Sequence, residues 1–354
     1  MTLIAGFHSF GTPVLVGDFL TSITGRPSGV RKKILRITDN FVLGWTGHLI
    51  AAQSVLNCLQ SSLGPDFVTL KSVRAILTDP ATSNLGFGLE VMLICWVIDD
   101  EGQHCFLWNS SYPQELFLGA PQYAGSGEST IRALVGPQGL HHSTPPVHAG
   151  HQESTRGVLG VITQLLRNEM LGPSTREMGY GFAYEILQLK DGARFEYVDD
   201  ILYFTIKCIL DENGQYVRNE FGSSLYKYKS EGNCTAVSIF DPLARRQDIH
   251  VITPPGDYVG QSTQYLKQTM LSQKYTAPFK SDYYSIVVQF QAPGFVCPPV
   301  ISIVPNDATE SSGFFIDVSE RNTLQLRPSK ELLEWMYKTI SEDLHKSSTQ
   351  HAQS

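Results

Sequence analysis

Four short apolar runs separated by turn residues fill the first 45 residues of this 354-residue chain. Turn residues at 11–13 separate the first pair of runs, and those at 38–40 separate the second pair. A parallel pair of strands needs a crossover of about a dozen residues or more, whereas antiparallel strands need only a tight turn. The start of the chain therefore predicts antiparallel hairpins, whose strands are expected in residues 3–7, 14–18, 33–37 and 41–45.

The apolar period changes after residue 47. Helical spacing of apolar residues marks three segments, and strand patterns return in three others. Hairpins that alternate with helices having one apolar face predict sheets covered by helices. The sequence thus predicts an α+β fold for residues 1–200, two stacked antiparallel sheets flanked by helices. The helices are expected in residues 48–63, 70–77 and 157–171, and the strands in residues 89–98, 104–108 and 182–189.

The pattern beyond residue 200 is weaker. A closing helix is expected in residues 329–344, after strands in residues 201–210, 235–240, 249–253, 283–290, 300–304 and 314–318. We therefore expect three parts in the chain. They are a domain of residues 1–200, a C-terminal α+β extension of residues 201–346 whose role the sequence does not indicate, and a polar tail of residues 347–354.

The composition disfavours several classes of function. The net charge is −7, and basic residues cluster only in short groups, which disfavours nucleic-acid binding. No window approaches the roughly 20 apolar residues that a membrane span needs. Residues 1–10 lack the features of a signal peptide. The six cysteines lie singly, a pattern typical of reduced thiols. These properties predict a cytoplasmic protein that binds neither membranes nor nucleic acid.

One polar loop, residues 137–154, is rich in histidine. No carboxylate or cysteine stands at a fixed ligand spacing beside these histidines, so we expect an exposed loop rather than a metal site. The Gly-Ser-Gly sequence of residues 125–127 lacks the rest of a phosphate-binding or dinucleotide-binding motif. No metal or cofactor is therefore expected. The four histidines of the loop are His141, His142, His148 and His151.

The second residue, Thr2, has the chemistry of an N-terminal nucleophile. A threonine hydroxyl is a weak nucleophile at neutral pH, because its proton must be removed as it attacks. A threonine at the N-terminus carries its own base, an α-amine with a pKa of about 8. A small second residue permits removal of Met1, so the sequence allows Thr2 to become the N-terminus.

The residues after Thr2 follow a pattern that resembles the proteasome β-subunits and the related HslV peptidases. That family has a strand led by threonine, an aspartate at the end of the second strand, a Lys-Lys pair at a strand start, and a glycine before a long helix. Here Asp18 lies sixteen residues after Thr2. Lys33 lies thirty-one residues after Thr2, one fewer than is usual in the family. Gly47 precedes the first expected helix, and Ser126 lies in the Gly-Ser-Gly motif.

The resemblance, which covers about residues 2–200, implies the N-terminal nucleophile hydrolase fold, a four-layer αββα sandwich. It also implies roles. Lys33 is the cation near the Thr2 amine, Asp18 orients Lys33, the Gly47 N–H stabilises the oxyanion, and Ser126 relays a proton.

One part of the chain departs from the family pattern. The family has an Asp-x-x-Ser-Gly-Gly sequence before its late strand, and this chain has Glu177 in place of the aspartate and Tyr180 where the serine is expected. Glu177 is therefore a candidate site residue with a longer side chain. The late part of the proton relay differs from that of the family.

The sequence predicts a hydrolase, a threonine-type peptidase acting on a peptide or another amide after removal of Met1. The resemblance implies a homo-oligomer, because peptidases of this family enclose their sites in rings. Two alternatives remain. One is a catalytically silent proteasome-like module for assembly or binding, favoured by Tyr180. The other is an amidase that acts on non-peptide substrates. The joint presence of Asp18, Lys33 and Ser126 favours an enzyme.

Overall fold

The computed structural model describes most of the chain from Thr2 to residue 338 and divides it into two compact units. The first unit contains residues 1–199, 230–236 and 251–266, and the second contains residues 200–229, 237–250 and 267–354. The first unit thus includes two segments from beyond residue 200. The described residues are 2–338 without 24–25, 65–66, 85–87, 141–150, 172–177, 182, 214, 242–245, 256–260, 277–278, 297–298, 307–313, 319–323 and 335–337.

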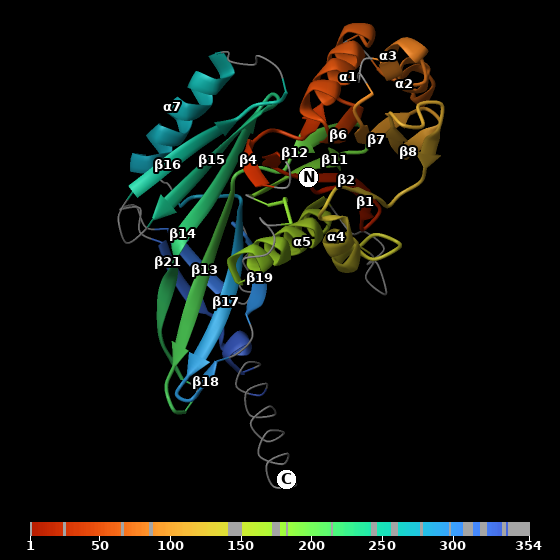
Figure 1. Ribbon diagram of the computed structural model, residues 1–354. Helices are drawn as coiled ribbons and strands as arrows, with labels where there is room; N and C mark the ends of the chain where they lie inside the picture. Colours follow the sequence, from red (N-terminus) through yellow and green to blue (C-terminus); the bar gives the residue numbers. More distant parts are fainter. Residues whose placement is uncertain are drawn as a thin grey trace. The chain divides into compact units, whose positions relative to one another are not determined.

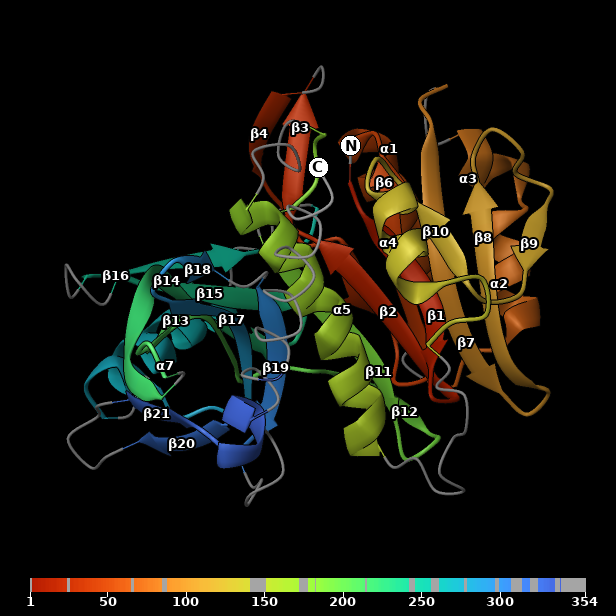
Figure 2. The same ribbon diagram turned by 90° about the horizontal axis from the view of Figure 1, so that it is seen from below.

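The first sheet of the first unit has the strand order β10-β1-β2-β11-β12, of which β1, β2, β11 and β12 are labelled in Figure 1 and all five strands in Figure 2. Each neighbouring pair is antiparallel, and the β1–β2 hairpin is the one expected from the first two apolar runs. The strands are β1 (Ile4–Ser9), β2 (Thr12–Asp18), β10 (Gln122–Ala124), β11 (Tyr184–Lys190) and β12 (Arg194–Tyr197).

The second sheet has the order β5-β6-β7-β8-β9 and is also antiparallel throughout. The hairpin of β5 and β6 corresponds to the strands expected in residues 33–37 and 41–45. The hairpin of β7 and β8 corresponds to those expected in residues 89–98 and 104–108. The strands are β5 (Ile34–Arg36), β6 (Phe41–Gly47), β7 (Val91–Asp99), β8 (Gly102–Asn109) and β9 (Leu116–Leu118).

The two sheets pack against each other through a buried apolar cluster that includes Ile4, Ile34 and Trp96. Two glycines allow the close approach. A Cβ on Gly44 would lie 2.6 Å from the Ile4 Cγ2 atom, and one on Gly17 would lie 2.7 Å from the Ile34 Cγ2 atom. Side chains at these positions would force the sheets apart.

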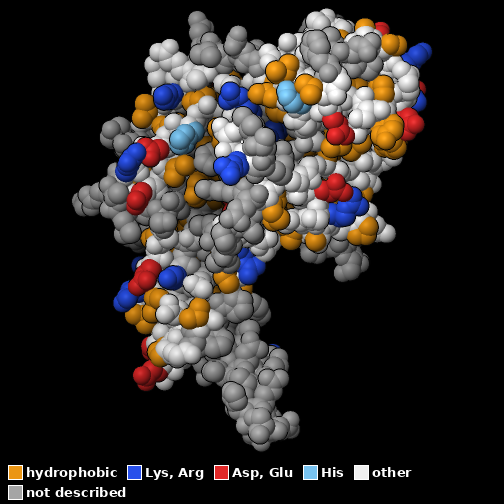
Figure 3. Space-filling model, in the orientation of Figure 1, with side chains coloured by type: hydrophobic (Ala, Val, Ile, Leu, Met, Phe, Trp, Pro, Cys, Tyr) orange, Lys and Arg blue, Asp and Glu red, His pale blue; other side chains and the backbone are white. Residues whose placement is uncertain are grey.

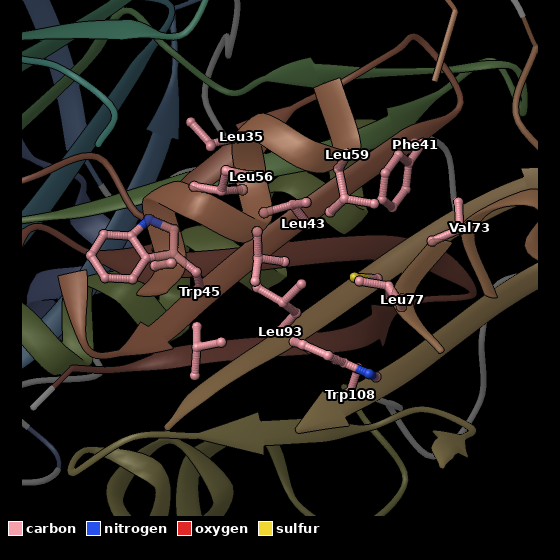
Figure 4. Packing of buried hydrophobic residues seen from close by; sticks show 14 of the residues in the cluster. Leu35, Phe41, Leu43, Trp45, Leu56, Leu59, Val73, Leu77, Leu93 and Trp108 are labelled. Carbon is pink, nitrogen blue, oxygen red and sulfur yellow. The ribbon is translucent and has the colours of Figure 1, made fainter. Parts of the chain in front are cut away.

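Helices cover the outer face of each sheet. Helices α1 (Leu49–Ser62), α2 (Leu70–Leu77) and α3 (Pro80–Asn84) follow β6, and α1 and α2 pack their apolar residues onto the second sheet in the cluster shown in Figure 4. Helices α4 (Glu128–Val135) and α5 (His151–Leu171) pack on the first sheet, where α5 crosses β2 and β11 (Figure 2). The expected mixed α+β fold with antiparallel sheets is confirmed.

Residues 20–30 form one element that their composition does not predict. The Gly, Pro and Ser content of residues 24–29 is typical of a loop, but β3 (Leu20–Ile23) and β4 (Arg26–Val30) form an antiparallel hairpin. Pro27 lies in β4, and the strand is mostly exposed. Proline is tolerated in an edge strand, where a missing N–H costs no buried hydrogen bond, so composition alone misled the prediction.

The second unit is built around a long sheet with the order β16-β15-β14-β13-β17-β18, in which β19 also pairs with β17. Strands β13 and β17 are parallel, unlike the pairs of the first unit. Its strands are β13 (Ile201–Leu210), β14 (Tyr216–Glu231), β15 (Cys234–Asp241), β16 (Arg246–Ile252), β17 (Tyr283–Ala292), β18 (Phe295–Val296) and β19 (Val300–Pro305), with α7 (Gln261–Thr276) between β16 and β17 and a separate hairpin of β20 (Phe314–Val318) and β21 (Leu324–Pro328).

The described surface carries charges of both signs. On the face seen in Figure 3, basic and acidic side chains are interspersed, and no single sign of charge dominates it. Within the described part of the chain, no helix is both long enough and apolar enough to cross a membrane.

Candidate active site

Asp18, the last residue of β2, is the centre of a buried cluster of polar groups. Its Oδ1 atom accepts hydrogen bonds from the Thr2 hydroxyl at 2.8 Å, the Leu3 N–H at 2.8 Å and the Lys33 ammonium at 2.6 Å. Its Oδ2 atom accepts one from the Gly181 N–H at 2.8 Å. A buried carboxylate requires such donors, because it has lost its hydration. The three residues Thr2, Asp18 and Lys33, expected to act together, therefore meet.

Lys33 lies directly before β5, and its side chain is 2% exposed. Its ammonium donates to Asp18 and to the Leu20 carbonyl oxygen. Burial lowers the pKa of Lys33, and the Asp18 carboxylate opposes that effect. A buried lysine with a lowered pKa holds its proton less tightly than a lysine in water does, which suits a group that assists proton transfer.

Thr2 lies two residues before β1 and is fixed by the loop of residues 125–127. Its carbonyl oxygen accepts hydrogen bonds from the Gly127 N–H at 3.1 Å and the Ser126 hydroxyl at 3.4 Å. Gly125 has a φ of +95°, and a Cβ there would lie 2.1 Å from the same oxygen. The Gly-Ser-Gly sequence thus serves as a close-fitting cradle for Thr2. Ser126 contacts the Thr2 carbonyl group, and the proton-relay role that the resemblance implied for it stays a prediction.

Gly47 ends β6 and is exposed, and His48 separates it from α1. Its φ is +106°, and a Cβ there would lie 2.3 Å from the Glu90 carbonyl oxygen. The His48 N–H donates to that oxygen at 2.9 Å. The contacts described for Gly47 are therefore with the start of β7, rather than with Thr2, Asp18 or Lys33. The backbone conformation and the contact with Glu90 therefore require glycine at this position, independently of any catalytic role of its N–H.

The departure from the family pattern lies around Tyr180. Glu177 falls outside the described residues. The Tyr180 side chain is buried, and its hydroxyl lies 3.0 Å from the Thr130 hydroxyl in α4. It therefore packs as a core residue.

The sequence did not predict one contributor to the site, the N–H of Gly181. This glycine has a φ of +119°, and a Cβ there would lie 1.8 Å from the Glu169 Oε1 atom. A side chain is therefore excluded, and the backbone N–H can reach Asp18. The two glycines flanking Tyr180 were the available signal.

The expected absence of a metal site concerns residues that are only partly described. Three of the four loop histidines, His141, His142 and His148, fall outside the described residues, whereas His151 begins α5. Among the described side chains, no group of three or more histidine, cysteine, aspartate or glutamate residues is arranged to hold a metal ion.

Comparison with known proteins adds nothing to the geometry. No protein-family model matches the chain, and no curated protein matches it. The function is therefore inferred from the site itself.

Proposed function

We propose that the protein is an N-terminal threonine amide hydrolase of the proteasome type, active once Met1 has been removed. The observation that carries the proposal is the convergence of the Thr2 hydroxyl and the Lys33 ammonium on one oxygen of Asp18. The packing of two antiparallel sheets between helices also supports it, because it agrees with the four-layer αββα sandwich of N-terminal nucleophile hydrolases.

The proposed reaction begins with proton transfer from the Thr2 hydroxyl to the free Thr2 α-amine as Oγ1 attacks the amide carbonyl carbon. The carbonyl oxygen becomes an oxyanion, for which the Gly47 N–H is the proposed donor. Collapse of the intermediate breaks the C–N bond, and the proton passes to the leaving amine, which leaves an ester on Thr2. Water then hydrolyses that ester with the same amine as base.

Lys33 and Asp18 have supporting roles in this reaction. The ammonium places a positive charge beside the hydroxyl, which favours the developing negative charge on Oγ1 and disfavours protonation of the amine. Asp18 keeps the ammonium charged and holds the Thr2 hydroxyl through its 2.8 Å contact. The substrate is proposed to be a peptide or another amide, and the protein to act in the cytoplasm.

A homo-oligomer is part of the proposal, because a peptidase of this type encloses its sites. Multi-angle light scattering over a range of concentrations tests this part. A monomer of 39.3 kDa at every concentration would refute the oligomer and leave the chemistry unaffected.

Substitutions at the site test the chemistry. Thr2→Ala is expected to reduce amide hydrolysis to background with unchanged folding, and Thr2→Ser to retain measurable turnover, because serine keeps the hydroxyl and the amine. Lys33→Ala is expected to lose at least about 10²-fold in kcat. Thr78→Ala, at a half-buried threonine directly after α2, is the control. Full activity in Thr2→Ala would eliminate the mechanism.

A second candidate, the silent module, is favoured by the burial of the site. Thr2 is 2% exposed in the chain that begins with Met1, so its hydroxyl is not open to a substrate there. The intact mass of the purified protein separates the candidates. Loss of Met1 together with hydrolysis supports the enzyme, whereas retained Met1 without hydrolysis supports the module.

A further inference from the structure

The two adjacent lysines of the Lys-Lys pair are both buried and have different partners. Lys33 binds Asp18, whereas Lys32 forms an ion pair with Glu185 in β11. The Lys32 side chain is fully buried, and its Nζ atom lies 3.9 Å from the centre of the Tyr197 ring. Burial lowers the pKa of Lys32, opposed by Glu185. A buried ion pair often adds little to the free energy of unfolding, so stability alone does not explain why the Lys32–Glu185 pair lies beside the candidate site.

The Lys32–Glu185 pair is completed by a segment from far along the chain. We call residues 230–236, where β14 turns into β15, the hairpin tip; they belong to the first unit. The Thr235 hydroxyl lies 2.5 Å from Lys32 Nζ and donates to the Glu185 Oε1 atom. The Ser230 hydroxyl lies 3.0 Å from that of Thr235 and 3.4 Å from Glu185 Oε1. The hairpin tip therefore closes the cluster around Lys32.

The same hairpin tip holds the strand that follows Lys33. The Asn233 side chain accepts a hydrogen bond from the Arg36 N–H at 3.1 Å and donates one to the Arg36 carbonyl oxygen at 3.0 Å. The Tyr197 hydroxyl donates to the Asn233 Oδ1 atom at 2.9 Å. The segment that carries Lys33 is thus fixed by the hairpin tip at both ends, at Lys32 and at Arg36.

We infer that the hairpin tip positions Lys33 for the chemistry at Thr2, with Thr235 and Asn233 as positioning residues; this inference rests on the proposed function. Lys32 and Lys33 are consecutive, so a shift of Lys32 also shifts the backbone from which the Lys33 ammonium reaches Asp18. A catalytic group must be held to within about 0.5 Å of its productive position. The later part of the chain therefore acts on the candidate site through the backbone of residues 32–36.

The cluster around Lys32 has no spare hydrogen-bond donor, among the described residues, that could replace a lost hydroxyl at Glu185. The Glu185 Oε2 atom is buried and has no hydrogen-bond partner among the described residues. Without the Thr235 hydroxyl, Glu185 Oε1 loses a donor, and the adjacent Lys32 ammonium loses an acceptor. Buried groups left without partners are costly, so the ion pair is expected to rearrange rather than stay in place.

The experiment compares two substitutions of Thr235. Thr235→Val keeps the shape of the side chain and removes the hydroxyl, whereas Thr235→Ser keeps the hydroxyl. Thr163→Val is the matched control, because Thr163 is equally buried and its hydroxyl donates to Leu159 within α5. We expect Thr235→Val to lower kcat about 10- to 100-fold with little change in KM, because a misplaced group costs chemistry rather than binding. Thr235→Ser is expected to restore kcat to within about threefold of the wild type.

The control separates positioning from stability. Thr163→Val is expected to lower the melting temperature without affecting kcat. Equal kcat values for Thr235→Val and the wild type, or equal losses in Thr235→Val and Thr163→Val, would overturn the inference. Should Thr235→Val not fold, Ser230→Ala, which removes only the contacts of the Ser230 hydroxyl, replaces it with the same expectation in kcat.

A second readout keeps the inference apart from the proposed function. If the wild type does not hydrolyse any amide, the proposed function fails, and the ionisation of Lys33 is then followed by NMR with ¹⁵N-labelled lysine, its signal assigned with Lys33→Arg. A shift of about half a pH unit or more in the Lys33 midpoint of Thr235→Val, absent in Thr163→Val, supports positioning. An unchanged midpoint overturns it.

Discussion

At the scale of single residues, the candidate site depends on one carboxylate with four donors. Asp18 receives two backbone N–H groups, one hydroxyl and one ammonium, so its charge is compensated although it is buried. Removing the carboxylate leaves all four donors without this shared acceptor. The site is therefore expected to contribute to stability as well as to chemistry.

Asp18→Asn tests that dependence. The amide keeps the shape, but it presents N–H groups where donors already point and leaves the Lys33 ammonium buried without a counter-charge. We expect the free energy of unfolding to fall by about 3–5 kcal/mol, measured in urea. Asp39→Asn is the control, because Asp39 is 73% exposed and its contact with Arg36 is expected to contribute less than about 1 kcal/mol. Equal effects of the two variants would contradict the account.

The lowered pKa of Lys32 gives stability a definite dependence on pH. Because the folded state releases this proton at a lower pH than the unfolded chain, the unfolded chain binds more protons between the lowered pKa and the usual value of 10.5. Stability from this group therefore rises with pH in that window. Burial raises the pKa of Tyr197, so the contribution of this group to stability falls with pH at high pH. That contribution must be subtracted from the measured dependence.

The subtraction uses Lys32→Met combined with Glu185→Gln, which keeps Tyr197. The free energy of unfolding of the wild type, relative to this double variant, is expected to increase as the pH rises from neutral toward 10.5. Urea titrations at several pH values measure the difference. A difference that stays flat or decreases over that range would show that burial of Lys32 is not the controlling factor.

At the scale of helices and strands, much of the first unit follows from local pattern. The helix at residues 70–77 was predicted with its observed bounds, and the β1–β2 and β5–β6 hairpins before it were predicted from turn chemistry, whereas the β3–β4 hairpin was not. Helix α7 was not predicted, because its few apolar residues, such as the buried Leu266 and Met270, give a weak periodic signal.

The candidate site could be predicted only in part. The spacing of Thr2, Asp18 and Lys33 pointed to one cluster, but the partners of Lys32 could not be derived, since Glu185 and Thr235 lie 153 and 203 residues away. Such contacts depend on tertiary packing, which cannot be derived from the local periodicity of apolar residues.

The cradle around Thr2 provides a prediction at this scale. Gly125→Ala is expected to displace Thr2, because its Cβ would meet the Thr2 carbonyl oxygen at 2.1 Å. Gly136→Ala is the control, because Gly136 has a φ of +79° with nothing within 4 Å of a Cβ, so it reports backbone strain alone. We expect the control to lose about 1 kcal/mol and Gly125→Ala at least about 2 kcal/mol more, with loss of hydrolysis. Thermal unfolding and an activity assay check both, and similar losses would contradict the cradle.

At the scale of the whole molecule, the first unit does not end at residue 199. It includes residues 230–236 and 251–266, and the Lys32 N–H donates to the Thr253 carbonyl oxygen at 2.9 Å. A fragment of residues 1–199 would therefore leave the Lys32 N–H without its acceptor, and Glu185 would lose the hydroxyls of Thr235 and Ser230.

We expect the fragment of residues 1–199 to lack cooperative unfolding, although residues 2 to about 200 looked like a domain in the sequence. Near-ultraviolet circular dichroism and thermal unfolding of the fragment and the full chain measure this. A fragment that unfolds as cooperatively as the full chain would show that the returning segments are dispensable.

The most direct test of the central claim is to map where the protein reacts with an electrophile. The full-length protein is treated with a peptide β-lactone, which acylates a nucleophilic hydroxyl, and intact mass and peptide mapping follow. The account predicts loss of Met1 and a single adduct on Thr2, absent in Thr2→Ala and strongly reduced in Lys33→Ala. An adduct at another residue, or a hydrolytically active protein that retains Met1 and leaves Thr2 unmodified, would contradict it.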